Sequence, residues 1–305
     1  MSAQYDLILK SASDAQIDIP PIVLVYGEGG VGKTTFAAGA PSPILLAAED
    51  GARRIRGVHR LPGEGVVTSW GEVLELTRAV AYGEHDYKSF VVDTIDLIEP
   101  HCVASVVKAS GKPTFEKMGW GKDEALIGEW RVWLSLLEHI RNRRNMTVIL
   151  LAHAAPRTIN DPTLGSFSGW SGKCGKNVWA VTCNWVDLVL FAQHDLALHE
   201  PDNGKARSIV TGARVLHTER GTGFEAKQRE GYRLPKRLPL SYEAFATALR
   251  ATEETPDAVA GRIAELVTVI GRPEVATKAA GFVKVAGQDV VKLREIENNL
   301  KVMVA

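Results

Sequence analysis

The chain has 305 residues, enough for one α/β domain of about 250 residues and a small addition. Its formal net charge is zero and 24% of its residues are charged, so any nucleic-acid binding must depend on local patches. Three cysteines, Cys102, Cys174 and Cys183, fit no metal-ligand spacing, and their odd number suits a reducing compartment. No apolar run approaches the roughly 18 residues that span a bilayer, so we expect a cytoplasmic protein without membrane contact.

The first element is a buried strand at residues 22–26, which follows a polar lead-in ending at Pro20 and Pro21. It runs into a glycine-rich turn and a short helix at residues 33–39. This stretch fits the phosphate-binding pattern G-x-x-x-x-G-K-[ST] without a mismatch. The expected nucleotide-binding residues are Gly27, Glu28, Gly29, Gly30, Val31, Gly32, Lys33, Thr34 and Thr35.

A triphosphate needs backbone N–H groups that converge on its oxygens, and glycines adopt the conformations that this requires. Lys33 is expected to reach the β and γ phosphates of ATP, and the Thr34 hydroxyl to bind Mg²⁺. The loop therefore predicts ATP and Mg²⁺ as cofactors.

Two further strands are expected to end in acidic residues. The apolar run 44–48 is followed by Glu49 and Asp50, and after a helix at 70–82 the strand 89–92 is closed by Asp93. Carboxyl ends of parallel strands form the ligand-binding edge of a sheet. Asp93, on a strand of Walker B form, is expected to hold Mg²⁺ through water.

An amphipathic helix is expected over residues 124–143, with its tryptophans in the core. The following strand, 147–152, delivers His153 to the same edge of the sheet. A histidine there is either structural or a sensor of the γ-phosphate.

Two segments, 108–123 and 154–177, are interpreted as long loops at the edge of the sheet. Each combines basic side chains with two aromatic ones, the mixture that follows phosphates and stacks on bases in single-stranded nucleic acid. Solvated loops or subunit contacts are the alternative. The candidate DNA-binding residues are Lys112, Phe115, Lys117, Trp120, Arg157, Phe167, Trp170, Lys173 and Lys176.

The strands 186–192 and 206–219 are expected to form a β-hairpin through the turn at Asp202, Asn203 and Gly204. A glycine-bearing basic segment with Lys227 and Arg229 follows. A helix is expected at 241–250. We place a domain boundary near 250, with a P-loop core at 1–250 and a small helical region at 251–305.

The order of these motifs resembles RecA-core P-loop ATPases, most closely the compact phage-encoded members of the single-strand annealing and recombination group. The resemblance covers about residues 18–240. It implies an α/β, RecA-like P-loop NTPase fold with a mostly parallel sheet flanked by helices. The added hairpin and the small helical C-terminal region are expected from the sequence pattern, and the resemblance does not cover the C-terminal helices. The resemblance also implies a homo-oligomer, ring or filament, and a possible single-strand binding protein as partner.

The same resemblance assigns roles to individual residues. Glu49 matches the glutamate that orients the attacking water, whereas His153 stands where RecA itself uses glutamine. Lys227 and Arg229 resemble the basic finger that reaches the γ-phosphate bound to a neighbouring subunit. A plain basic surface cluster is the alternative for this pair.

The leading hypothesis is an ATPase that acts on single-stranded DNA in recombination or annealing. The alternative is an ATP-driven protein switch or assembly factor without DNA contact. A small-molecule kinase is a third class, against which the hairpin at 186–219 argues.

Overall fold

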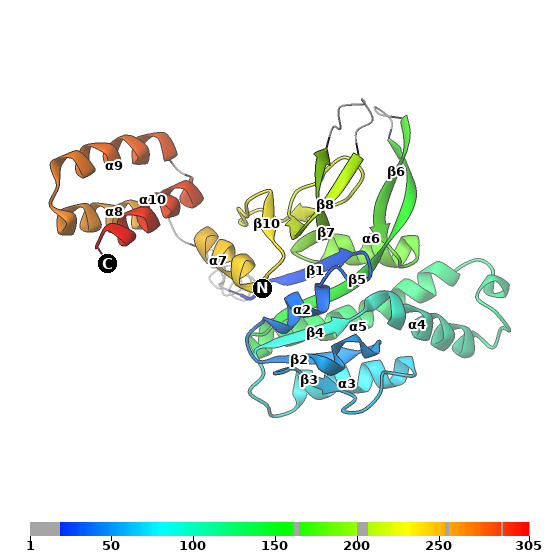
Figure 1. The fold of residues 1–305 in the computed structure, drawn as a ribbon. Helices are drawn as coiled ribbons and strands as arrows, with labels where there is room; N and C mark the ends of the chain where they lie inside the picture. The colour runs from blue at the N-terminus through cyan, green and yellow to red at the C-terminus, as the bar shows by residue number, and fades with distance from the viewer. Residues whose placement is uncertain (1–18, 162–164, 200–206, 254–255, 288, 305) are drawn as a thin grey trace, which may run out of the picture.

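The structure is a computed structural model, and it describes residues 19–161, 165–199, 207–253, 256–287 and 289–304. Figure 1 shows a central sheet flanked by helices, and a group of helices set to one side beyond α7.

The strands lie in the order β10-β8-β7-β1-β5-β4-β2-β3, with β6 pairing to β5 and β9 to β7. Their bounds are β1 Ile22–Gly27, β2 Pro43–Ala47, β3 His59–Leu61, β4 Ser89–Asp93, β5 Thr147–Asp161, β6 Gly165–Gly172, β7 Leu188–His199, β8 Arg207–His217, β9 Lys227–Gln228 and β10 Arg237–Pro239. The pairs β1·β5, β1·β7, β4·β5, β2·β4 and β2·β3 are parallel. Every residue of β1 is buried, as expected for a strand with parallel neighbours on both sides.

The helices are α2 Lys33–Ala38, α3 Trp70–Tyr82, α4 Ile95–Ser110, α5 Lys122–Arg144, α6 Lys176–Trp185, α7 Tyr242–Glu253, α8 Pro256–Ile270, α9 Pro273–Ala286 and α10 Val290–Val304. Two short 3₁₀ turns span Asp50–Arg54 and Glu116–Met118. None of the described helices combines the length and the apolar character that a bilayer crossing demands.

Side chains alternate between the two faces of β1 and so divide the core into two layers. Leu24 and Tyr26 pack with α3, α4, α5 and α6 on one face. Val23 and Val25 pack with α2 and α7 on the other. Trp130 and Trp133 of α5 are fully buried and donate to Thr182 and Thr77, which confirms their expected place in the core.

The predicted α/β architecture is confirmed: a mostly parallel sheet between helices, an antiparallel hairpin made by β7 and β8, and helices at the C-terminus. The turn expected at residues 202–204 lies outside the described residues. One prediction was wrong. The supposed loop 154–177 contains the outer half of β5 and all of β6, a second hairpin paired from Ala154↔Gly172 to Asp161↔Gly165. The strand β6 was not recognised in the sequence, because its many glycines and serines do not produce the alternation of apolar and polar residues that marks a strand.

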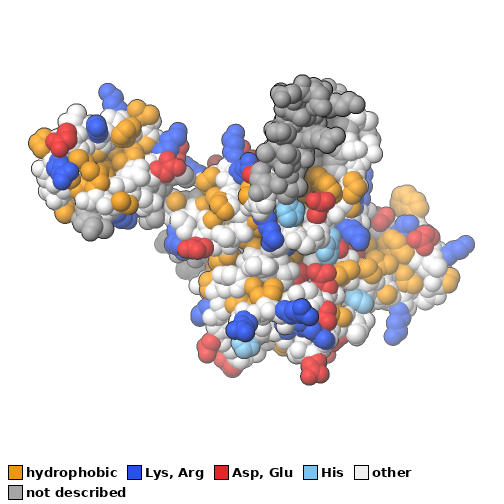
Figure 2. Space-filling model, in the orientation of Figure 1, with side chains coloured by type: hydrophobic (Ala, Val, Ile, Leu, Met, Phe, Trp, Pro, Cys, Tyr) orange, Lys and Arg blue, Asp and Glu red, His pale blue; other side chains and the backbone are white. Residues whose placement is uncertain are grey.

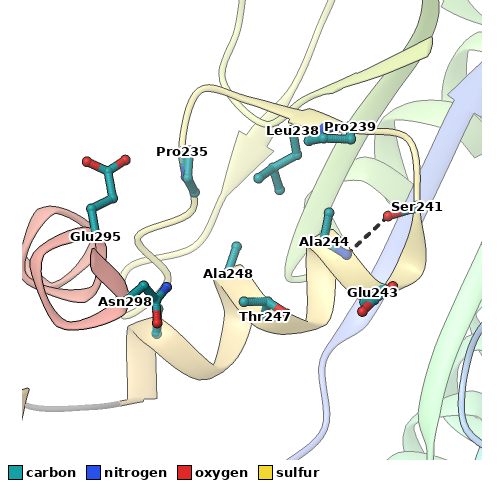
Figure 3. A pocket seen from close by; sticks show the side chains of 11 residues that line it. Pro235, Leu238, Pro239, Ser241, Glu243, Ala244, Thr247, Ala248, Glu295 and Asn298 are labelled. Atoms are coloured by element: carbon teal, nitrogen blue, oxygen red, sulfur yellow. Dashed lines mark hydrogen bonds between the residues drawn. The ribbon is translucent and has the colours of Figure 1, made fainter. Parts of the chain in front are cut away.

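The C-terminal helices α8, α9 and α10 enclose an apolar cluster that is distinct from the two clusters of the sheet and also includes Ala251, near the end of α7. A hollow lined by α7, β10 and α10 lies between α10 and the core (Figure 3). Its wall is mostly small or apolar, with Leu238, Ala244 and Ala248 on the core side and Glu295 and Asn298 on α10.

Candidate nucleotide site

The P-loop lies between β1 and α2. Gly27 ends β1 in the centre of the sheet, and a Cβ there would come within 2.2 Å of the Ala192 carbonyl oxygen, so only glycine fits. Gly30 and Gly32 have φ angles of 78° and 111°, in the region that favours glycine. These conformations let the chain turn sharply into α2, whose first residue is Lys33.

Lys33 points back into the loop. Its Nζ donates to the carbonyl oxygens of Gly27 at 2.9 Å and Glu28 at 3.0 Å, and the residue is 5% exposed. Burial lowers the pKa of this ammonium, while Asp93 and Glu49 act in the opposite direction. The group is held where its charge attracts phosphate oxygens.

Asp93 ends β4 and is fully buried. Its Oδ2 accepts a hydrogen bond from the Thr34 hydroxyl at 2.9 Å, and its Oδ1 has no hydrogen-bond partner within the described residues. Burial raises the pKa of this carboxyl to about 6, although the Thr34 hydrogen bond acts against it. Carboxylate and hydroxyl oxygens are ligands that Mg²⁺ accepts, so Thr34 and Asp93 fit the metal that the sequence predicts.

Glu49 and His153 face one another beside this pair. His153 is in register with Gly27 across β1 and β5, and its Nε2 lies 3.8 Å from Glu49 Oε2. The neighbouring Asp50 instead pairs with Arg53 at 2.7 Å and Arg60 at 3.2 Å. The chain therefore brings Lys33, Thr34, Asp93, Glu49 and His153 to one edge of the sheet.

Asp96 is a residue of this site that sequence reasoning missed. It lies in the first turn of α4, and its carboxylate accepts hydrogen bonds from the His153 backbone N–H and from Nδ1. The sequence signal was the spacing of three residues between Asp93 and Asp96. It points to this site only if a helix is expected to begin directly after β4.

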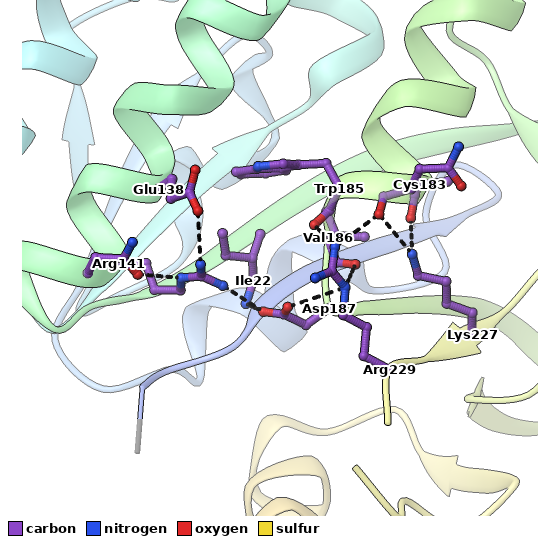
Figure 4. A network of polar contacts seen from close by, with 11 residues as sticks. Ile22, Glu138, Arg141, Cys183, Trp185, Val186, Asp187, Lys227 and Arg229 are labelled. Carbon is purple, nitrogen blue, oxygen red and sulfur yellow. Dashed lines mark hydrogen bonds and ion pairs between the residues drawn. The ribbon is translucent and has the colours of Figure 1, made fainter. Parts of the chain in front are cut away.

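Lys227 and Arg229 lie elsewhere. β9 pairs with Leu188 and Val189 at the start of β7. The P-loop instead begins at Gly27, which is opposite Ala192, at the far end of the stretch of β7 that pairs with β1. Figure 4 shows both side chains directed at the carbonyl end of α6. Lys227 donates to the carbonyls of Cys183 and Asn184, and Arg229 to those of Asn184, Trp185 and Val186.

The two basic groups therefore cap a helix of their own subunit, a role that sequence reasoning did not foresee. Arg229 also lies 3.7 Å from Asp187, which binds Arg141 and the backbone N–H of Ile22 at the start of β1. To reach the γ-phosphate of a neighbouring subunit, either side chain would first have to leave these carbonyls. The proposed function therefore does not include such a finger.

The candidate DNA-binding residues fall into two groups. Lys112, Phe115, Lys117 and Trp120 lie between α4 and α5, where the Trp120 side chain is fully exposed and Lys122 lies 5.2 Å from the centre of the Phe115 ring. The others lie on the β5–β6 hairpin or just after it: Arg157, Phe167, Trp170, Lys173 and Lys176.

In the second group, Arg157 donates to the Cys174 carbonyl, and Trp170 stacks on Phe191 with 6.4 Å between ring centres. Lys173 and Lys176 are exposed. The side chain of Phe167 lies outside the described part of the structure. Trp170 thus contributes to packing, whereas Trp120 presents its ring to solvent.

The loop, the buried lysine and the paired Thr34 and Asp93 define a P-loop nucleotide-binding protein. A family model described as an AAA domain matches residues 19–230, and the chain belongs to that family.

Two individual proteins are similar to this chain. The SPbeta prophage-derived uncharacterized protein YorG of Bacillus subtilis strain 168 is 26% identical over 143 residues, which are 44% of this chain and 41% of that protein. The chain thus spans about two-fifths of that relative's length. The crystal structure of the RadB recombinase is similar with a TM-score of 0.41 and 14% identity, over 74% of this chain and 90% of that one.

Proposed function

We propose that this protein binds and hydrolyses ATP and that it acts on single-stranded DNA in recombination or annealing. The observation that carries the proposal is continuity of the chain. The strand that ends in Asp93 leads through α4 to the exposed Trp120, and the strand that holds His153 continues as the β5–β6 hairpin. A change at the phosphate site can therefore move both basic and aromatic segments.

In the proposed reaction, water attacks the γ-phosphate in line with the leaving oxygen. Lys33 and the loop amides hold the phosphate charge, and Glu49 orients the water and accepts its proton. Thr34 and Asp93 would hold Mg²⁺, which would supply neutralisation of phosphate charge. His153 responds to the γ-phosphate from the strand next to the loop.

Nucleotide binding is tested by Lys33→Ala. Removal of the main cation should weaken binding of a fluorescent ATP analogue by an order of magnitude or more. Unchanged affinity in an equilibrium titration would refute the assignment of the loop.

DNA binding is tested by fluorescence anisotropy with labelled poly-dT, with and without ATP. Because the Trp120 side chain is fully exposed, Trp120→Ala removes no packing contact and is a cleaner probe than Trp170→Ala. We expect a loss of about 1–3 kcal/mol, the usual loss per stacked base, and a steep fall in affinity with salt. Phe282→Ala, at a 61% exposed aromatic on α9, is the matched control.

A second candidate is an ATP-driven protein switch or assembly factor, favoured by apolar side chains exposed on α8, α9 and α10. Figure 2 shows hydrophobic surface over these helices, and the exposed residues include Val269, Phe282, Val285, Val302 and Met303. Exposed apolar surface of this kind is typical of protein contacts. This candidate would be favoured over the first if the protein hydrolysed ATP but did not bind poly-dT, or bound it with an affinity that does not change with salt.

A further inference from the structure

The guanidinium of Arg214 lies against the P-loop. A Cβ built on Gly32 would lie 2.9 Å from Arg214 Nη1 and 3.7 Å from Arg214 Cδ. Gly32 immediately precedes Lys33, so its backbone belongs to the turn that would cradle phosphate oxygens. An arginine from another strand thus stands beside the loop within the same subunit.

The fold fixes this approach through the main chain. β8 follows β7, which pairs directly with β1, and Arg214 is opposite His194 in the β7–β8 register. Leu216, two residues further along β8, packs in the core layer that contains α2. Alternation along the strand therefore places Arg214 on the α2 side of the sheet as well. The Arg214 carbonyl accepts a hydrogen bond from Leu240 N–H at 2.9 Å, which ties the backbone down.

The other end of the site shows which part of a nucleotide Arg214 would meet. Three groups are suited to the γ-phosphate: Asp93 on β4, His153 on β5 and Glu49 just after β2. All three elements lie on one side of β1 in the sheet. Arg214 comes from the opposite side, across β7. A nucleotide whose terminal phosphate meets Asp93 and Glu49 must extend its α-phosphate and sugar away from them, toward β7 and β8.

Arg214 is also chemically available for this contact. It is exposed, and no hydrogen bond or ion pair to the described residues holds its guanidinium. Arginine presents several donors in a planar fork that matches phosphate oxygens, and its charge persists at all relevant pH values. Within the described part of the chain, this guanidinium beside a phosphate loop is a donor without an acceptor.

We propose that Arg214 is a nucleotide-binding residue that acts within its own subunit and contacts the nucleotide at its α-phosphate end. This role rests on the proposed nucleotide binding and adds to the loop a cation from the hairpin strand β8. ADP and ATP share the α-phosphate, so both should depend on Arg214 to the same degree. The contact should also be independent of self-association.

The test is equilibrium titration of fluorescent ATP and ADP analogues with Arg214→Ala and Arg214→Gln. We expect each variant to bind both nucleotides about 10-fold more weakly, by the same factor for ATP and ADP, at low and high protein concentration alike. Thermal stability without nucleotide should stay unchanged, since the guanidinium has no partner to lose among the described residues. Arg233→Ala, at a second arginine of the core domain, is the control and should bind like the parent.

Parental affinity in both Arg214 variants, with binding by the parent protein intact, would overturn the role of Arg214 and leave the proposed function standing. Failure of the parent protein itself to bind nucleotide would overturn both. If only ATP were weakened, Arg214 would meet the γ-phosphate and the proposed orientation of the nucleotide would be wrong. Arg214→Gln retains a long polar side chain, so it remains informative if the alanine variant does not fold.

Discussion

The Asp96 carboxylate accepts two hydrogen bonds from one residue, His153: from its backbone N–H at 2.9 Å and from ring Nδ1 at 3.0 Å. The ring is thereby fixed with a proton on Nδ1 and with Nε2 directed to Glu49 at 3.8 Å. The hydrogen bond to Asp96 raises the pKa of His153, against the effect of burial. Burial acts to raise the pKa of Asp96, but the hydrogen bonds from His153 outweigh it and the pKa is lowered.

Asp96→Asn should lower the pKa of His153 toward its ordinary value of 6.5, because the amide cannot supply the negative charge that favours imidazolium. NMR titration of the ring measures this, with His85 as the internal control. A raised histidine pKa stabilises the fold below pH 6.5, and that contribution is lost as pH rises through the folded value. A lowered aspartate pKa stabilises it above pH 3.8, and that contribution is lost as pH falls.

The stability gap between parent and Asp96→Asn should therefore be widest between pH 3.8 and 6.5, where both contributions are present. Urea titrations across this range check the shape of the gap. A gap independent of pH would show that Asp96 contributes only packing and backbone hydrogen bonding.

Glu49→Gln should retain ATP and slow its hydrolysis by about 10²–10⁴-fold, since an amide keeps the shape of the side chain but cannot accept a proton. Single-turnover, rapid-quench measurement of ADP formation follows the cleavage step without interference from product release. Asp50→Asn is the matched control, because Asp50 already pairs with Arg53 and Arg60. If the Asp50 variant loses turnover and the Glu49 variant does not, the water is oriented by Asp50.

Asp93→Asn should stabilise the nucleotide-free protein above pH 6. It should also weaken the effect of Mg²⁺ on stabilisation by bound ADP. The pKa of Asp93 rises on folding from 3.8 to about 6, so its ionisation opposes folding as pH rises through that range. Removing the charge should regain up to about 3 kcal/mol at about pH 8 and little at about pH 4. Thermal melts at both pH values, with ADP and with or without Mg²⁺, measure the two effects. Equal Mg²⁺ dependence in parent and variant would place the metal elsewhere.

Arg229→Ala should destabilise the fold by about 1–3 kcal/mol, since the carbonyls at the end of α6 lose a charged donor. Specific ATPase activity of the folded fraction should stay near that of the parent and should not rise with protein concentration. Guanidinium unfolding and activity at several concentrations measure these quantities.

A different outcome would contradict this prediction for Arg229. A loss of about 10³-fold in turnover with unchanged stability, restored by mixing Arg229→Ala with Lys33→Ala protein, would establish a finger between subunits. Lys227→Ala extends the comparison to the second basic group at the same helix end.

Most of the sheet could be predicted from the sequence, because its strands are short, continuous apolar runs bounded by glycine, proline or acidic residues. The helix α3 matches its predicted range, 70–82, since an N-terminal serine and apolar periodicity mark its extent. The helix α4 and the strand β6 were missed. Pro100 interrupts the helical pattern of the first, and the second is composed largely of glycine and serine.

By itself, the sequence determined the P-loop and the acidic strand ends, because that chemistry depends on residue types at fixed spacing within one turn. Only the tertiary structure decided which distant groups share a site. Asp96 meets His153 because β4 and β5 are paired, which places the first turn of α4 beside His153. Arg214 reaches Gly32 because β8 lies one strand away from β1, across β7. Lys227 and Arg229 bind the end of α6 for the same kind of reason: contacts between elements follow from the order of strands in a sheet, which local spacing does not encode.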